Sequence, residues 1–182
     1  MDEKLEKQID LITENLKSVP MSNYDIKAID PTIKITYSDN LEFMRFADEL
    51  FFDYNDIGIL LWKTDETTGH WLGLIRNDKN KTIEVFDSYA YNFKNINKHL
   101  NSIMNLSPTL LLDLIRNSGY KAIFNKKIYQ NRRDVNNQSC GRWVLLRLSL
   151  KKYNLKDFDR ILQMIKKKMD IKPLELSVLN SL

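Results

Sequence analysis

Two runs of β-type residues separated by a short polar turn constrain the fold of this chain more than any other feature. The first run covers residues 70–75, the second covers residues 82–87, and a polar segment with Asn and Asp lies between them. Apolar, aromatic and β-branched residues on both sides of such a turn are typical of a β-hairpin. The sequence therefore predicts two antiparallel strands joined by residues 76–81.

The expected register of this hairpin brings an acid next to a base. We expect the turn to be centred between Asp78 and Lys79, because this register aligns apolar residues of the two strands. The aligned apolar pairs are Leu72 with Val85 and Leu74 with Ile83. The same register places His70 opposite Asp87, and opposed Cβ atoms lie about 4.5–5.5 Å apart. Since side chains alternate between the two faces, a slip of one residue would break both matches.

The only cysteine, Cys140, lies where a polar loop meets an apolar helical run. Residues 136–139 are polar and turn-forming, and residues 143–148 are mostly apolar. The free N–H groups and the dipole at a helix N-terminus favour an anion there. A thiol in such a place, beside a histidine, can have its pKa lowered from about 8.5 to roughly 3.5–7.5. Cys140 is therefore a candidate nucleophile, with His70 as its base and Asp87 as the group that orients the base.

Three short motifs, in the order His, Asp, Cys, resemble the adenovirus-type maturation proteases, which belong to the clan of the SUMO-specific proteases. The motifs are Gly69-His70-Trp71, Phe86-Asp87-Ser88-Tyr89 and Ser139-Cys140-Gly141-Arg142-Trp143. The similarity covers roughly residues 21–150 and is strongest to the versions in virophages, Polinton-like elements and large DNA viruses. It implies cleavage of peptide bonds in capsid proteins, often after small residues such as glycine.

The resemblance also implies a glutamine in the oxyanion hole, but the usual position of this residue is not filled. It is expected six or seven residues before the nucleophile, where this chain has Asp134 and Arg133. Two candidates remain: Gln130, which ends a strand-like run, and Gln138, two residues before Cys140. We favour Gln130, with an enlarged loop at residues 131–137, because Gln138 is so close in sequence that its side chain would struggle to reach the same pocket.

The rest of the chain predicts an α+β fold in which a mixed central β-sheet is flanked by helices. A continuous apolar run at residues 57–62 suggests a central strand that is covered on both faces. The polar loop that follows, residues 63–68, is placed to border a substrate cleft. Helices are expected at 2–18, 39–50, 95–104, 107–118, 140–152 and 154–168, and further strands at 32–37 and 120–130. We expect one protease domain over residues 1–182, with residues 1–19 as a helical arm or packing helix.

Composition excludes several other classes of protein. One cysteine excludes an internal disulfide and suits a reducing compartment, and with only His70 and His99 as imidazoles a zinc site is poorly supplied with ligands. No run is long and apolar enough for a membrane span, and the acidic N-terminus is unlike a signal peptide. The net charge of +4 and the lysine run at residues 166–168 allow at most weak binding to DNA.

The function that these features favour is that of a cysteine endopeptidase with catalytic residues Cys140, His70, Asp87 and Gln130. We expect no metal or organic cofactor, capsid or other structural precursor proteins as substrates, and action in the virion and in the host cytoplasm or nucleus. One alternative keeps the triad but makes the protein an isopeptidase of ubiquitin-like conjugates or an acyltransferase. Another is a non-enzymatic basic module associated with capsid or DNA.

Overall fold

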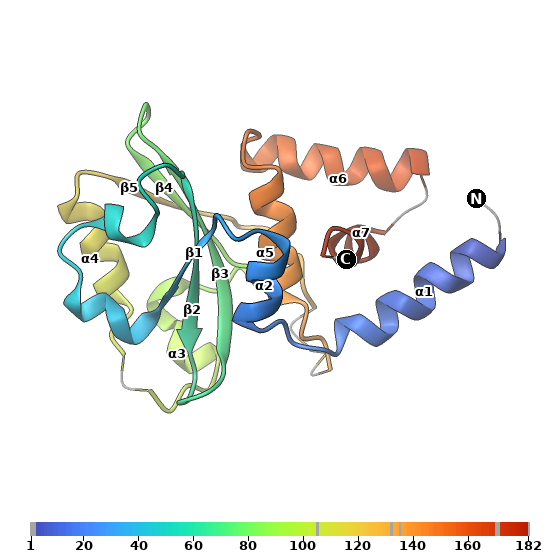
Figure 1. The fold of residues 1–182 in the computed structure, drawn as a ribbon, viewed down its shortest axis with the longest axis horizontal. Helices are drawn as coiled ribbons and strands as arrows, with labels where there is room; N and C mark the ends of the chain where they lie inside the picture. Colours follow the sequence, from blue (N-terminus) through green and yellow to red (C-terminus); the bar gives the residue numbers. More distant parts are fainter. Residues whose placement is uncertain (1–2, 105, 132, 135, 170–171, 182) are drawn as a thin grey trace.

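A five-stranded mixed β-sheet forms the centre of the molecule (Figure 1). The computed structural model describes residues 3–104, 106–131, 133–134, 136–169 and 172–181. The strands lie in chain order across the sheet: β1 (Lys34–Tyr37), β2 (Ile57–Lys63), β3 (Gly69–Asn77), β4 (Thr82–Phe86) and β5 (Lys121–Phe124). The two outer pairs are parallel and the two inner pairs are antiparallel. The predicted α+β fold with a mixed sheet and flanking helices is confirmed.

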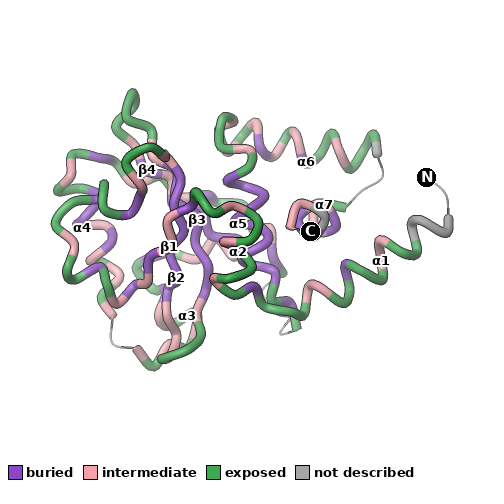
Figure 2. The backbone as a smooth tube through the Cα atoms, in the orientation of Figure 1, coloured by how far each residue is buried: buried purple, intermediate pink, exposed green. Residues whose placement is uncertain are grey.

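Two apolar cores cover the two faces of the sheet. On one face pack the helices α2 (Asn23–Ile29), α5 (Cys140–Ser149) and α6 (Leu155–Met169). On the other face pack α3 (Ile96–His99), α4 (Thr109–Asn117) and the 3₁₀ turns before β2. Figure 2 shows the buried residues concentrated in the sheet and in α5. The apolar run of β2 is buried along six consecutive residues because both of its faces meet one of these cores.

The hairpin of β3 and β4 forms, but its predicted register is wrong by two residues. Leu74 pairs with Val85 and Arg76 with Ile83, so the turn is centred near Asn80 and not between Asp78 and Lys79. The ladder ends at the pair Gly73–Phe86, and His70 and Asp87 lie beyond it. A shift of two residues keeps every side chain on its expected face because the side-chain period of a strand is two.

Three predicted elements are shorter or different in kind. The helix expected over residues 95–104 covers only Ile96–His99, the helix α3. Residues 39–50 form two 3₁₀ turns, η1 (Ser38–Phe43) and η2 (Ala47–Leu50), and not one α-helix. Phe43 and Phe46 are exposed there, so the apolar residues of this segment do not share one buried helical face. The strand expected over residues 120–130 ends at Phe124, where the side chain of Asn125 turns to bind the backbone of Asp87.

The two ends of the chain lie on the same side of the molecule, beyond α5 (Figure 1). Helix α1 (Glu3–Lys17) extends away from the sheet and contacts α7 (Pro173–Leu179), which packs on α5. Helix α7 was not predicted. Its signals are a proline in the first turn and Glu175, which accepts a hydrogen bond from the Lys172 N–H at 2.8 Å.

Candidate active site

His70 and Asp87 form a buried hydrogen-bonded pair at one end of the β3–β4 hairpin. Nε2 of His70, the second residue of β3, lies 2.7 Å from Oδ1 of Asp87, the first residue after β4. Both side chains are almost completely buried. The Asp87 carboxylate also accepts the backbone N–H groups of Tyr89 and Tyr91, each at 2.8 Å. These contacts hold the carboxylate in the orientation that it needs to bind the ring.

Cys140 lies on the other side of the His70 ring, at the first residue of α5. Nε2 of the ring is bonded to Asp87, which leaves Nδ1 as the ring nitrogen that hydrogen-bonds the sulfur. The backbone N–H groups of Trp71 and Gly141 also point to the sulfur. The structure therefore brings together the three side chains that the sequence singled out, although His70 and Cys140 are 70 positions apart along the chain.

The electrostatics of this cluster favour charges on all three groups. Burial opposes each charge and is the largest single influence on each pKa, but the contacts within the cluster outweigh it. The Asp87 carboxylate and the hydrogen bond to Cys140 raise the pKa of His70 above 6.5, and His70 in turn lowers the pKa of Asp87 below 3.8. His70 and the N–H groups of Trp71 and Gly141 lower the pKa of Cys140 below 9.0. All three shifts act in the same sense and favour a thiolate, an imidazolium and a carboxylate over the neutral thiol, imidazole and carboxylic acid.

Gln130 is buried beside this cluster, and its amide is fully bonded. Its position is fixed by its own backbone N–H, which donates to Ser88 O at 3.0 Å. Its Oε1 accepts the Ser88 hydroxyl at 2.9 Å, while Nε2 donates to Tyr89 Oη at 2.9 Å and to Asn137 O at 2.6 Å. The bond to Asn137 ties Gln130 to the loop before the nucleophile. Of the enlarged loop expected at 131–137, residues 132 and 135 lie outside the described part of the chain.

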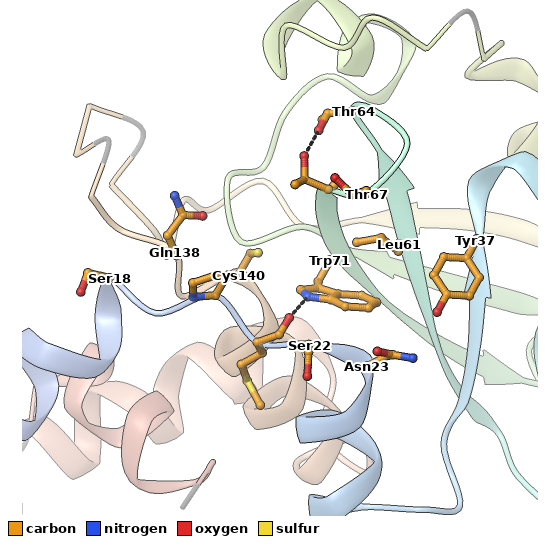
Figure 3. Close-up of a pocket in the computed structure, with 14 residues that line it drawn as sticks. Ser18, Ser22, Asn23, Tyr37, Leu61, Thr64, Thr67, Trp71, Gln138 and Cys140 are labelled. Atoms are coloured by element: carbon orange, nitrogen blue, oxygen red, sulfur yellow. Dashed lines mark hydrogen bonds between the residues drawn. The ribbon is translucent and has the colours of Figure 1, made fainter.

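Gln138 differs from Gln130 in its surroundings. It is exposed, and it lines the same cleft as Cys140, where Figure 3 shows its side chain on the loop that leads to the nucleophile. Its backbone N–H donates to Lys17 O at 2.5 Å. The two glutamines thus lie in different environments, one in the buried network and one at the rim of the cleft.

A cleft of about 710 Å³ opens beside the sulfur (Figure 3). One wall is the connection between α1 and α2, and the opposite wall includes the end of β1 and the β2–β3 loop. The polar loop at residues 63–68 does border the cleft, as expected. The residues that line the cleft include Ser18, Met21, Ser22, Tyr37, Leu61, Thr64, Thr67, Thr68, Trp71, Gln138 and Cys140.

Comparison with known proteins agrees with this geometry. Residues 43–174, well over half of the chain, match the Ulp1 protease family, C-terminal catalytic domain. The chain belongs to the Ulp1 protease family. It is therefore a cysteine-type peptidase, as the His, Asp and Cys motifs suggested, and this family argues against the alternative of a non-enzymatic module.

This Ulp1-family protease also has a viral relative. It is 30% identical, over 150 residues, to the uncharacterized protein V9 of Sputnik virophage. The aligned part covers 79% of this chain and 83% of the relative. The predicted likeness to virophage proteases is confirmed.

Several residues of the site were not found from the sequence. Asn125 of this Ulp1-family chain holds both backbone groups of Asp87: its Oδ1 accepts the Asp87 N–H at 2.8 Å and its Nδ2 donates to Asp87 O at 2.7 Å. Tyr89 stacks on His70 with ring centroids 4.9 Å apart. Burial and the nearby Cys140 raise the pKa of Tyr89. Asn125 gave no signal because its partner is 38 positions away, but Tyr89 directly follows the Asp87-Ser88 motif.

Two kinds of feature are absent from the described residues of this protease. Within those residues there is no group of three or more His, Cys, Asp or Glu side chains placed to hold a metal ion. The described helices include none that is long and apolar enough to cross a bilayer. His99, expected to be solvated, is exposed and stacks on Tyr91 with ring centroids 4.7 Å apart.

Proposed function

We propose that this Ulp1-family protease is an endopeptidase that cleaves capsid and other structural precursor proteins with a triad of Cys140, His70 and Asp87. The observation that carries the proposal is the buried His70–Asp87 pair, at 2.7 Å, in contact with the only thiol of the chain. The virophage relative and the motifs shared with viral maturation proteases support a viral structural protein as the substrate.

The first half of the reaction is acyl transfer to the sulfur. The Cys140 thiolate attacks the scissile carbonyl carbon, a C–S bond forms, and the carbonyl oxygen becomes an oxyanion. The imidazolium of His70 then gives its Nδ1 proton to the leaving amine as the C–N bond breaks. Asp87 keeps its charge throughout, fixes the ring orientation and stabilises the imidazolium.

The second half returns the enzyme to its starting state. A water molecule gives one proton to Nδ1 of His70 and attacks the thioester carbonyl. The C–S bond breaks, the Cys140 thiolate leaves, and the new carboxyl end of the peptide is released. Protein groups and water account for every proton and electron pair in this cycle.

The oxyanion is held by the backbone N–H of Cys140 together with the side chain of Gln130. The N–H groups in the first turn of a helix have no partner within the helix, so the N-terminus of α5 offers donors to a negative oxygen. Nε2 of Gln130 is connected to the site through Tyr89. It donates to the hydroxyl of Tyr89, and the ring of Tyr89 stacks on His70. In this proposal the bond from Gln130 Nε2 to Tyr89 Oη must break when substrate binds, because only then is that N–H free to donate to the oxyanion.

The walls beside the sulfur support cleavage after small residues. Trp71 and Met21 both line the cleft next to Cys140. A Cβ atom on Gly141 would lie 3.1 Å from atoms of each of these side chains, so they leave little free space around the residue after the nucleophile. A glycine or another small residue before the scissile bond fits such a constriction better than a large one.

The same proposal includes where and with what the protein acts. We place its action in a reducing compartment, the virion and the host cytoplasm or nucleus, because its activity needs the single thiol to stay reduced. Its substrates are proteins, and the net charge of +4 allows weak DNA binding that salt would weaken. Residues 1–182 act as one protease domain, with residues 1–19 as a helical arm or packing helix.

The experiment that tests this function uses candidate capsid proteins from the same viral source. We expect the wild-type protein to produce new termini, identified by mass spectrometry, and Cys140→Ala to produce none while it keeps the wild-type circular dichroism spectrum. Asp87→Asn should be slower than wild type and faster than Cys140→Ala, because it keeps the nucleophile but loses the charge beside His70.

The controls separate the remaining substrate classes. Equal cleavage by Cys140→Ala would contradict a cysteine mechanism. Rapid labelling of Cys140 by a SUMO or ubiquitin C-terminal probe, with no cleavage of capsid proteins, would replace the proposed substrate by a ubiquitin-like conjugate. A thioester that transfers its acyl group to an amine in place of water would indicate the acyltransferase.

A further inference from the structure

The connection between α1 and α2 lies directly against the catalytic centre. Three backbone carbonyls, on alternate residues from Lys17, the last residue of α1, to Met21 in the connection, each accept a hydrogen bond from the site. Lys17 O accepts the Gln138 N–H at 2.5 Å, Val19 O accepts Nη1 of Arg142 at 2.7 Å, and Met21 O accepts Nε1 of Trp71 at 2.9 Å. Figure 3 shows the last of these bonds. We call residues 17–21 the strap.

The three donors are neighbours of the proposed catalytic residues. Trp71 directly follows His70 on β3, while Gln138 and Arg142 lie two residues before and two residues after Cys140. The strap is therefore bonded to the strand that carries the base, to the loop before the nucleophile and to the helix that begins at the nucleophile. A weaker ionic contact adds to these bonds, because Nζ of Lys17 lies 3.8 Å from the Asp134 carboxylate in the same loop.

Close packing supports the same role for the strap. The Cβ position of Gly141 is 3.1 Å from Met21 Cβ and 3.3 Å from Met21 Sδ. A side chain on Gly141 would push the strap away from the first turn of α5, so the residue after the nucleophile is small where the strap passes. The strap lies outside residues 43–174, the part of the chain that matches the family.

We propose that the strap is a positioning element of the catalytic centre: it fixes the nucleophile loop and the start of α5 relative to the strand that carries His70. This inference rests on the proposed function, because it assumes that Cys140 and His70 act together. The strap supplies only backbone carbonyls and does not touch the reacting atoms. Its effect on catalysis is through alignment, and misplacement of reacting groups by about 1 Å can cost on the order of 100-fold in rate.

The test removes the donors, because a backbone carbonyl cannot be removed by substitution. Trp71→Phe keeps an aromatic ring but loses the indole N–H, and Arg142→Met keeps the aliphatic stem but loses the guanidinium. Two variants serve as matched controls. Trp62→Phe loses the hydrogen bond that the indole N–H donates to Asn97 Oδ1 at 2.7 Å, and Arg160→Met removes a guanidinium on the exposed side of α6. Arg142→Lys restores one donor and the positive charge.

Three readouts distinguish positioning from a general effect on stability. The first readout compares the change in kcat with the change in KM on a cleaved peptide. The second is the pH midpoint of Cys140 alkylation by iodoacetamide. The third is the rate of hydrogen exchange at the backbone amide of Gln138. For the double variant Trp71→Phe/Arg142→Met we expect about a tenfold fall in kcat, since each lost bond is worth about two- to tenfold. We also expect a smaller change in KM, a higher alkylation midpoint and faster exchange at Gln138.

The two control variants and Arg142→Lys should behave differently from the double variant. Trp62→Phe and Arg160→Met should keep the wild-type alkylation midpoint, and Arg142→Lys should recover part of the kcat lost in Arg142→Met. If the double variant loses stability but its folded fraction keeps the wild-type kcat, midpoint and Gln138 exchange, the strap is not a positioning element. Alkylation and exchange need no substrate, so a failure to cleave capsid proteins would refute the proposed function without altering this test.

Discussion

Asp87 is a buried acid whose carboxylate accepts hydrogen bonds from His70 and from two backbone N–H groups. These bonds leave the carboxylate charged despite its burial, and its charge is what raises the pKa of His70. The raised His70 pKa in turn stabilises the Cys140 thiolate. The reactivity of the sulfur therefore depends on an acid that it does not itself touch.

The two glutamines near the nucleophile should respond differently to truncation. Gln130→Ala removes the proposed oxyanion donor, which typically contributes about 2.7–4 kcal/mol to transition-state stabilisation, so we expect kcat to fall on the order of 10²–10³-fold. Gln138→Ala should change kcat little, because its exposed side chain lies at the rim of the cleft. Steady-state kinetics on one peptide substrate measures both.

A thermal melt is the control for this comparison. Gln130 also bonds Ser88 and Asn137, so its loss should lower the melting temperature as well as kcat. The reverse order of the two kcat values would move the oxyanion role to Gln138.

At this scale the sequence predicted the site through residue type and strand periodicity. His70 and Asp87 meet although the register differs by two residues and both lie beyond the last pair of the β3–β4 ladder. Asn125 could not be predicted, since its two bonds to the Asp87 backbone depend on where β5 ends. The hydrogen bond from Gln130 to Tyr89 likewise depends on how the loops pack, and the spacing of residues in the sequence does not predict it.

At the scale of secondary-structure elements, a buried ion pair joins the nucleophile helix to the sheet. Nε and Nη2 of Arg147 on α5 lie 2.7 and 2.9 Å from the carboxylate oxygens of Glu84 on β4. The Arg147 side chain is 1% exposed and also donates to the carbonyls of Leu150 and Tyr153. This arginine fixes α5 across the strand that leads to Asp87.

Loss of Arg147 should destabilise the fold more than loss of the whole pair. Arg147→Met leaves the largely buried carboxylate of Glu84 without its partner, so we expect the free energy of unfolding to fall by about 3 kcal/mol. The double variant Arg147→Met/Glu84→Met should lose less, because neither charge then remains buried. Urea unfolding of the two variants measures the difference, and an Arg147→Met protein as stable as wild type would refute this role.

The elements that the sequence predicted well are those with a strong local pattern. The buried run of β2, the hairpin and the proline-led α4, which ends near Gly119 at φ +79°, all have such signals. Residues 39–50 have helical spacing, but tertiary packing buries only Leu41, Ala47 and Leu50, so two 3₁₀ turns form in its place. The contact of α1 with α7 joins the two ends of the chain and has no local signature.

At the scale of the whole molecule, the coupled pKa shifts determine how stability varies with pH. Because the pKa of Asp87 is lowered, its contribution is present above 3.8 and is lost as the pH falls through the lowered value. Because the pKa of His70 is raised, its contribution is complete below 6.5 and is lost as the pH rises through the raised value. The lowered Cys140 pKa acts in the opposite direction, with a contribution that is complete above 9.0.

These signs predict a difference between wild type and Cys140→Ala. Above pH 6.5 and above the lowered pKa of Cys140, up to pH 9.0, the folded pair of His70 and Cys140 holds one proton, on the ring, and the unfolded pair also holds about one, on the thiol. The wild-type free energy of unfolding should therefore be nearly constant over this range. Cys140→Ala removes the thiol proton from the unfolded chain, so its free energy of unfolding should fall as the pH rises. Urea titrations at several pH values measure both curves, and parallel curves would contradict the coupling.

The central claim is that His70 holds Cys140 as a thiolate, and the pH dependence of alkylation measures this most directly. Iodoacetamide reacts with the thiolate, and the chain has one cysteine, so the rate reports Cys140 alone. We predict a wild-type midpoint below 9.0 and a higher midpoint in His70→Asn, because burial is then opposed only by the N–H groups of Trp71 and Gly141. A wild-type midpoint near 9.0 that His70→Asn leaves unchanged would contradict the claim.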